Sequence, residues 1–191
     1  MEKKVFEFTH KRKEGHTWVA EVGWHDNYRD YVILKQKDCS NGKIVTIIMH
    51  NPGRFKNNKD EIYTDSTLRH IRKAFENSGY TLEILNLFNL SQATLKKFKE
   101  TSDEIKNNCN PLEEILKQPT GRKIVVIQWG KPKTYSQKRQ QEVYSLIEKN
   151  GLNAIGLRNK DGSYSHPSHW KPDKIKEFRE KILPEIDRKL K

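Results

Sequence analysis

Histidine, asparagine and small polar residues recur beside the most apolar segments of the chain. Imidazole and amide groups can hold water, read hydrogen-bonding groups on a ligand and stabilise developing charge. The four groups are His50-Asn51-Pro52-Gly53 after the apolar run at 44–49, Asn86 within the run at 82–87, Trp129-Gly130 after 124–128, and His166-Pro167-Ser168-His169-Trp170 downstream of 152–157. Their recurrence predicts one composite polar site.

The four apolar runs are expected to be strands, because they are short, rich in β-branched residues and bounded by turn residues. Helical spacing predicts helices between and after them, at 65–79 (capped by Asp65-Ser66-Thr67), 95–105, 111–117, 136–149 and 174–190. Pro184 is expected to kink or shorten the last helix. This alternation predicts a parallel sheet sandwiched by helices. Ligands of such sheets bind beyond the carboxyl ends of the strands, so the four polar groups are expected to meet there.

The N-terminal region reads as additional β structure. Alternating apolar and polar residues at Val5–His10 and His16–Val22 predict a β-hairpin, Tyr31–Leu34 a short buried strand, and Asn41-Gly42 a hairpin turn. We therefore expect one α/β domain, a three-layer sandwich with a central, mainly parallel four-stranded sheet extended by an N-terminal hairpin. Its parts would be a β extension at 1–43, the core at 44–170 and a C-terminal helix at 171–191.

Composition limits the function classes. The 191 residues include 37 Lys and Arg against 25 Asp and Glu, a net charge of +12, which favours an anionic partner such as nucleic acid. Two cysteines argue against a disulfide scaffold or a cysteine-rich zinc site. The apolar runs are too short for a membrane span, and the charged N-terminus lacks a signal-peptide pattern. These features predict a cytoplasmic protein that does not associate with membranes.

The order of Asn-Pro-Gly, Ile-Leu-Asn, a strand ending in Trp-Gly, and His-Pro-Ser resembles the uracil-DNA glycosylase superfamily over about 44–170. The Asn-Pro-Gly loop matches the mismatch- and thymine-type members. The chain also resembles a bacterial and phage family of unknown function with Asn-Pro, Asp-x-Thr-x-Arg (Asp65, Thr67, Arg69), Asn-Leu-Phe and His-Pro motifs. The first resemblance implies hydrolysis of an N-glycosidic bond after the base has left the stack.

The glycosylase resemblance assigns three catalytic candidates. Asn51 takes the position of the group that orients water, although an amide cannot act as a base as the aspartate of uracil-specific members does. His166 matches the donor to the departing base; alternatively it caps a loop or binds phosphate. Asp65 is the candidate for a second carboxylate, or it is a simple helix N-cap.

The base-binding candidates follow from the same motifs. Asn86 matches the amide that reads the base edge, or it satisfies neighbouring backbone. Gly53 leaves open the space that a tyrosine closes in uracil-specific members, or it only permits a tight turn. Phe55 or Phe88 is expected to stack on the base, and His50 is also expected to be one of the base-binding residues.

Further residues are assigned to DNA. Ser168 is expected to grip a phosphate, and Trp170 to wedge into the duplex or to pack on the last helix. His166 and His169 alone are too few to indicate a metal site. The remaining DNA-binding candidates surround the predicted pocket mouth and are Arg54, Lys56, Trp129, Gly130, Lys131, Lys133, Arg158 and Lys171.

Together these features predict a monomeric, cofactor- and metal-free DNA glycosylase acting on a flipped, 5-substituted pyrimidine in double-stranded DNA, in repair or phage defence. Asn51, Asn86 and His166 are expected to line one base-sized cavity. Two alternatives stay open: an inactive nucleic-acid-binding module of the same fold, and a hydrolase of free nucleosides or nucleotides.

Overall fold

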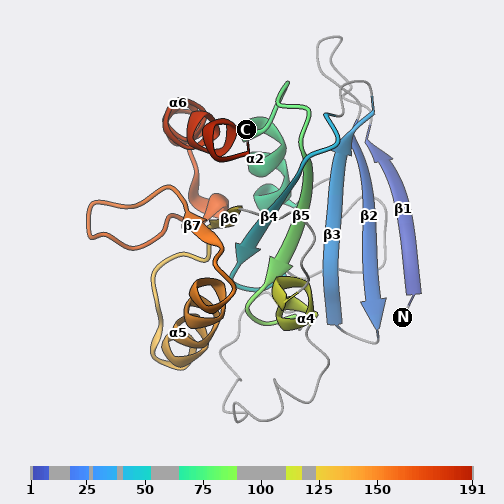
Figure 1. Ribbon diagram of the computed structural model, residues 1–191. Helices are drawn as coiled ribbons and strands as arrows, with labels where there is room; N and C mark the ends of the chain where they lie inside the picture. Colours follow the sequence, from blue (N-terminus) through green and yellow to red (C-terminus); the bar gives the residue numbers. More distant parts are fainter. Residues whose placement is uncertain are drawn as a thin grey trace.

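A single seven-stranded sheet runs through the molecule (Figure 1). The computed structural model describes residues 2–8, 18–25, 28–37, 41–52, 65–89, 111–117 and 124–190. The strand order is β1-β2-β3-β5-β4-β6-β7. The strands are β1 (Glu2–Phe8), β2 (Trp18–His25), β3 (Tyr28–Gln36), β4 (Ile44–Met49), β5 (Thr81–Asn86), β6 (Ile124–Ile127) and β7 (Asn153–Ile155).

The four strands β5-β4-β6-β7 are parallel, as predicted. β4 lies at the centre because its sequence, IVTIIM, can be buried on both faces, and its residues 45–49 are buried. It pairs with β5 on one side, where Met49 lies opposite Asn86, and with β6 on the other. The carboxyl ends of these three strands therefore lie side by side.

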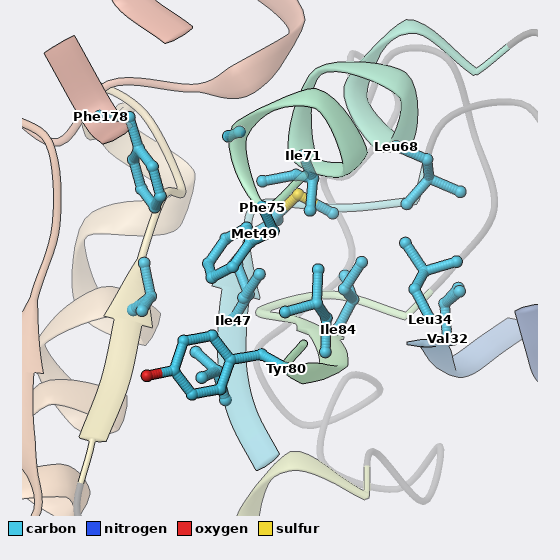
Figure 2. Close-up of a cluster of buried hydrophobic side chains, with 14 of the residues drawn as sticks. Val32, Leu34, Ile47, Met49, Leu68, Ile71, Phe75, Tyr80, Ile84 and Phe178 are labelled. Atoms are coloured by element: carbon cyan, nitrogen blue, oxygen red, sulfur yellow. The ribbon is translucent and has the colours of Figure 1, made fainter. Parts of the chain in front are cut away.

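Helices cover both faces of the sheet (Figure 1). They are α2 (Ser66–Ala74), α4 (Leu112–Lys117), α5 (Thr134–Lys149) and α6 (Pro172–Lys189), and the 3₁₀ turn η2 (Pro167–His169) precedes the last of them. Buried apolar residues of α2 and α6 share one core cluster with β3, β4 and β5, and Figure 2 shows Ile71, Phe75 and Phe178 among these side chains. A second cluster joins α4 and α5 to the opposite face. The three-layer α/β sandwich is confirmed.

The N-terminal extension is larger than the predicted hairpin. β1 and β2 pair in antiparallel fashion as expected, but β3 spans nine residues, pairs with β2 and then joins the parallel sheet antiparallel to β5. The hairpin predicted at Asn41-Gly42 is wrong, because β5 lies between β3 and β4.

Two helix predictions need comment. The segment predicted to be helical at 95–105 lies outside the described residues. Pro184 does not shorten the last helix, which continues to Lys189, because Phe178, Ile182 and Ile186 anchor one face of α6 in the core on either side of the proline.

Candidate functional site

The polar groups predicted at the strand ends meet at the carboxyl edge of β5, β4 and β6. Backbone hydrogen bonds beyond the regular ladder hold them together. The N–H of Leu87 donates to the carbonyl oxygen of Met49 (2.9 Å), and that of Phe88 to His50 (3.1 Å). On the other side of β4, Gln128 donates to Ile48 (2.9 Å). The residues after three strands are thus fixed relative to one another.

His166 is held in one tautomer immediately before η2. The backbone N–H of Ser168 donates to its Nδ1 (3.2 Å), and the Ser168 hydroxyl oxygen lies 2.7 Å from the same nitrogen. Because Nδ1 accepts, the proton of the neutral ring lies on Nε2. Nδ1 of His70, on α2, lies 2.6 Å from the carbonyl oxygen of Pro167 and so ties the turn to that helix. The result is a fixed imidazole with Nε2–H as its donor.

The surroundings of His166 keep it neutral. Burial is the largest cause and lowers its pKa to about 4; repulsion from the neighbouring imidazoles of His50 and His169, whenever they carry a proton, acts in the same direction. The carboxylate of Asp65 opposes this effect and Lys133 adds to it, each more weakly. These groups come from four separate segments of the chain, at residues 50, 65, 133 and 169, and each is near enough to influence the charge of this imidazole. At neutral pH His166 is an uncharged hydrogen-bond donor.

His50 and Asn51 form a second ordered pair. Nδ1 of His50 lies 2.9 Å from Oδ1 of Asn51, and the Asn51 amide nitrogen donates to the Pro52 carbonyl (2.9 Å), so His50 donates from Nδ1. Burial lowers the pKa of His50, and the bond to Asn51 opposes that shift. Nε2 is then a buried acceptor with no hydrogen-bond partner among the described residues.

Aromatic rings enclose His50. Its ring centroid lies 5.4 Å from that of Phe88 and 5.7 Å from that of Tyr135. Phe88 is buried, whereas Tyr135 is 38% exposed at the start of α5, with the Lys133 ammonium 5.9 Å from its ring. Phe88 therefore packs against His50 from the core, and Tyr135 lies between His50 and the solvent.

Asp65 caps α2, which was one of its two predicted roles. Its Oδ1 accepts from the N–H of Leu68 (3.0 Å), and its Oδ2 faces the guanidinium of Arg29 on β3, 3.8 Å away. Arg29 is fully buried, and burial lowers its pKa while Asp65 opposes this. Arg29 was not among the predicted site residues, since nothing in the pattern of β3 distinguishes an arginine directed into the protein from one directed at solvent.

Asn86 is buried at the end of β5 beside Met49 of β4, at the predicted edge. Its role as reader of a base edge stays a prediction, as does the shared cavity with Asn51 and His166. Gly53, Arg54, Phe55 and Lys56 lie outside the described residues.

Three residues assigned to DNA have other contacts. Trp170 is 3% exposed, donates from its indole N–H to the Ser165 hydroxyl (2.9 Å) and stacks against Phe178 of α6 (5.1 Å between rings). The wedge role does not fit this position, because inserting the ring into a duplex would remove it from the core. Trp129 is also buried, edge-on to Tyr164. Ser168 binds the His166 ring.

The basic candidates in the described part of the chain are exposed around this edge. Lys131 pairs with Asp161 (3.2 Å), Arg158 donates to the Gly162 carbonyl (2.7 Å), and Lys171 precedes α6. Gly130 has a different role. A Cβ added there would lie 3.2 Å from Cβ of His166, so the glycine lets the loop after β6 approach the imidazole closely.

Within the described ranges, the chain shows neither a metal-binding cluster nor a membrane-crossing helix. No group of three or more His, Cys, Asp or Glu side chains there could hold a metal ion. Among the helices of the same residues, none combines the length and apolar character needed to cross a membrane.

These observations define a class: a three-layer α/β protein with a polar, histidine-containing site at the carboxyl edge of its parallel strands. Within that class, the chain belongs to the DUF1643 family, described as a protein of unknown function, whose model matches residues 31–168. This confirms the predicted resemblance to a family of unknown function.

One solved structure is similar in outline. It is a structure from Bacteroides fragilis NCTC 9343 whose name describes it as an acetyl xylan esterase. The sequence identity to this chain is 9%, and the TM-score is 0.36. The match covers 89% of this chain and 56% of that one. A likeness of this size carries no functional argument. No curated protein matches the chain.

Proposed function

We propose that this protein is a DNA glycosylase-like enzyme that hydrolyses the N-glycosidic bond of a flipped pyrimidine, with a 5-substituted base as the favoured substrate. The observation that carries the proposal is His166, a neutral imidazole with its proton on Nε2, at the edge shared by His50, Asn51 and Asn86. The order of the motifs resembles the uracil-DNA glycosylase superfamily, and the net charge of +12 suits DNA.

In the proposed reaction, the bond between the sugar C1′ and the base nitrogen breaks through an oxocarbenium-like state. The bonding electron pair leaves with the base, and negative charge spreads to its carbonyl oxygen. The Nε2–H of His166 donates to that oxygen, which lowers the barrier without full proton transfer. The positive charge of Lys133, which influences both histidines, favours the same anion.

Water completes the reaction at C1′. Asn51 is the proposed positioning group, and its amide is oriented by His50 on one side and by the Pro52 carbonyl on the other. An amide orients water without accepting its proton, so the proton passes to solvent after attack. The chemistry is therefore expected to depend mainly on stabilisation of the leaving base.

The test is incubation of the pure protein with duplexes that carry uracil, a mismatched thymine or a bulky 5-modified cytosine, followed by alkaline cleavage at abasic sites. We expect product on at least one substrate, and His166→Ala is expected to reduce the rate about 10²- to 10³-fold. Arg188→Ala, at the exposed end of α6, is expected to keep full activity and so controls for a general effect of substitution. Absence of abasic sites on every duplex would contradict the proposal.

A non-catalytic nucleic-acid-binding module is the second candidate. Two observations favour it: position 51 holds an amide where uracil-specific enzymes have a carboxylate, and Asp65 is engaged as a helix cap. It predicts salt-sensitive DNA binding without product, and no change of affinity in His166→Ala.

A further inference from the structure

A cavity of about 510 Å³ is lined in part by the Gly130 loop, which also approaches His166. Its walls are the loop 129–132 after β6, one face of α5, and the segment 158–164 after β7. Gly130 contributes to the wall and also approaches the His166 ring, so the cavity and the candidate active site share one backbone segment. A volume of this size suits a ligand of nucleotide dimensions.

The cavity presents a fixed arginine. The guanidinium of Arg158 lies 4.1 Å from the ring centroid of Tyr164, and donates to the Tyr164 hydroxyl (2.9 Å) and to the Gly162 carbonyl (2.7 Å). Three contacts hold the planar group in one orientation. A preorganised guanidinium is a suitable phosphate ligand, because little side-chain freedom is lost on binding.

The carboxylate in the wall does not cancel this charge. Asp161 accepts from the hydroxyl and the backbone N–H of Ser163 (2.6 and 3.1 Å) and pairs with Lys131. The Ser163 hydrogen bonds, followed by Lys131, lower the pKa of Asp161 to about 2. The charges of Asp161 and Lys131 therefore offset each other, and Arg158 leaves the wall with a net positive charge.

The α5 side of the cavity offers amides and an aromatic ring. Gln137, Gln141 and Tyr144 lie on one face of the helix at spacings of four and three residues, and all three line the cavity. Glutamine amides provide a donor and an acceptor for a base edge, and a tyrosine ring offers a stacking surface.

We propose that this cavity is a nucleotide subsite, which binds a base through the α5 face and a phosphate through Arg158. Its role as the site for a nucleotide flanking the excised one rests on the proposed function. The nucleotide chemistry could equally come from a free mononucleotide, and the experiment separates the two sources.

The experiment measures binding by titration calorimetry with His166→Ala protein, so no turnover is involved. The probes are a single-stranded pentanucleotide, deoxycytidine monophosphate and inorganic phosphate. Gln141→Glu adds a negative charge to the cavity wall, and is expected to weaken pentanucleotide binding about tenfold. Ser145→Glu places the same charge on the exposed surface of α5 outside the cavity, and is expected to change binding less than twofold.

Tighter binding of the pentanucleotide than of the mononucleotide, with both weakened by Gln141→Glu, supports a strand subsite. Equal affinities that are weakened alike support a site for a free nucleotide. Equal effects of Gln141→Glu and Ser145→Glu, or binding of phosphate as tight as of either nucleotide probe, would overturn the proposal. The binding measurement does not depend on excision. It therefore tests the subsite even if the glycosylase assay gives no product.

Discussion

The Ser168 backbone N–H and the His166 Nδ1 are joined by a hydrogen bond of 3.2 Å within one short turn. The bond decides which ring nitrogen carries the proton, since a nitrogen that accepts cannot also be protonated in the neutral ring. The α2 helix holds the same turn through His70. The chemistry proposed for Nε2 therefore depends on backbone geometry at the opposite side of the ring.

The lowered pKa values of His50 and His166 predict an acid-sensitive fold. In the unfolded chain both imidazoles titrate near 6.5, so between about pH 4 and 6.5 the unfolded state binds more protons than the folded state. The free energy of unfolding therefore falls as the pH drops through this window. We expect Tm to fall by about 4 °C or more between pH 7 and pH 5.

The matched variant for this prediction is His166→Gln, which removes one of the two groups and should show a smaller fall in Tm over the same interval. The interval avoids Asp161, whose pKa of about 2 lies below it. An identical fall in both proteins would contradict the assignment of the effect to His166.

Gly130→Ala is expected to displace His166. The new Cβ would lie 3.2 Å from Cβ of the histidine, and φ at this position is +83°, a conformation that strains side-chain-bearing residues. Gly151→Ala is the control, because φ there is +65° and nothing lies within 4 Å of the added atom. Both variants should lose about 1 kcal/mol of stability from backbone strain.

Only Gly130→Ala should also change the chemical shift and the titration of His166, which NMR measures. The same variant should lower any excision activity about tenfold or more. If the two alanine variants behave alike in these measurements, the contact between residues 130 and 166 has no consequence for the site.

Asn51→Asp is expected to raise the pKa of His50. A carboxylate at this position still accepts from Nδ1–H and adds a negative charge beside the ring, which stabilises the imidazolium and so raises the pKa. Asn51→Ala removes the acceptor, so the effect of burial is unopposed and the pKa falls further. NMR titration of His50 in the three proteins measures both changes. A His50 pKa that is the same in all three would show that the 2.9 Å contact is not a hydrogen bond in solution.

Trp170→Phe is expected to reduce stability and leave the DNA affinity of the folded protein unchanged. It removes the indole hydrogen bond to Ser165 and part of the packing on Phe178, with a loss of about 2 kcal/mol in the free energy of unfolding. Ser165→Ala should cost about 1 kcal/mol, and the double variant less than the sum, because the two residues share one bond. Urea denaturation measures these values. Unchanged stability with reduced DNA affinity would restore the wedge role.

Local pattern was enough to predict the parallel strands and the edge where the polar groups meet. The runs at 44–49 and 124–127 are too apolar for anything but a covered strand, and the residues that follow them must lie at one edge. The position of β3 beside β5 was not predictable, because strand pairing between distant segments leaves no periodic signal in either one.

The sequence was ambiguous wherever one residue type suits two environments. Asp65 fits a helix cap and a catalytic carboxylate equally well, and Trp170 fits both a core and a DNA surface. The neighbours Leu68 and Arg29 show that Asp65 caps α2 and faces a cation, while its catalytic role stays a prediction; Phe178 shows that Trp170 packs in the core. His166 was identified from its motif, but its tautomer depends on a 3₁₀ turn that the sequence pattern did not predict.

Arg29 lies two residues upstream of the segment that the family model matches. A fragment trimmed to that segment would lose β1, β2 and the guanidinium that faces Asp65. Recombinant work on this family should therefore retain β1, β2 and the whole of β3. A shortened protein without activity would lack both the edge strands and the cation that faces Asp65, so its inactivity would not test the proposed function.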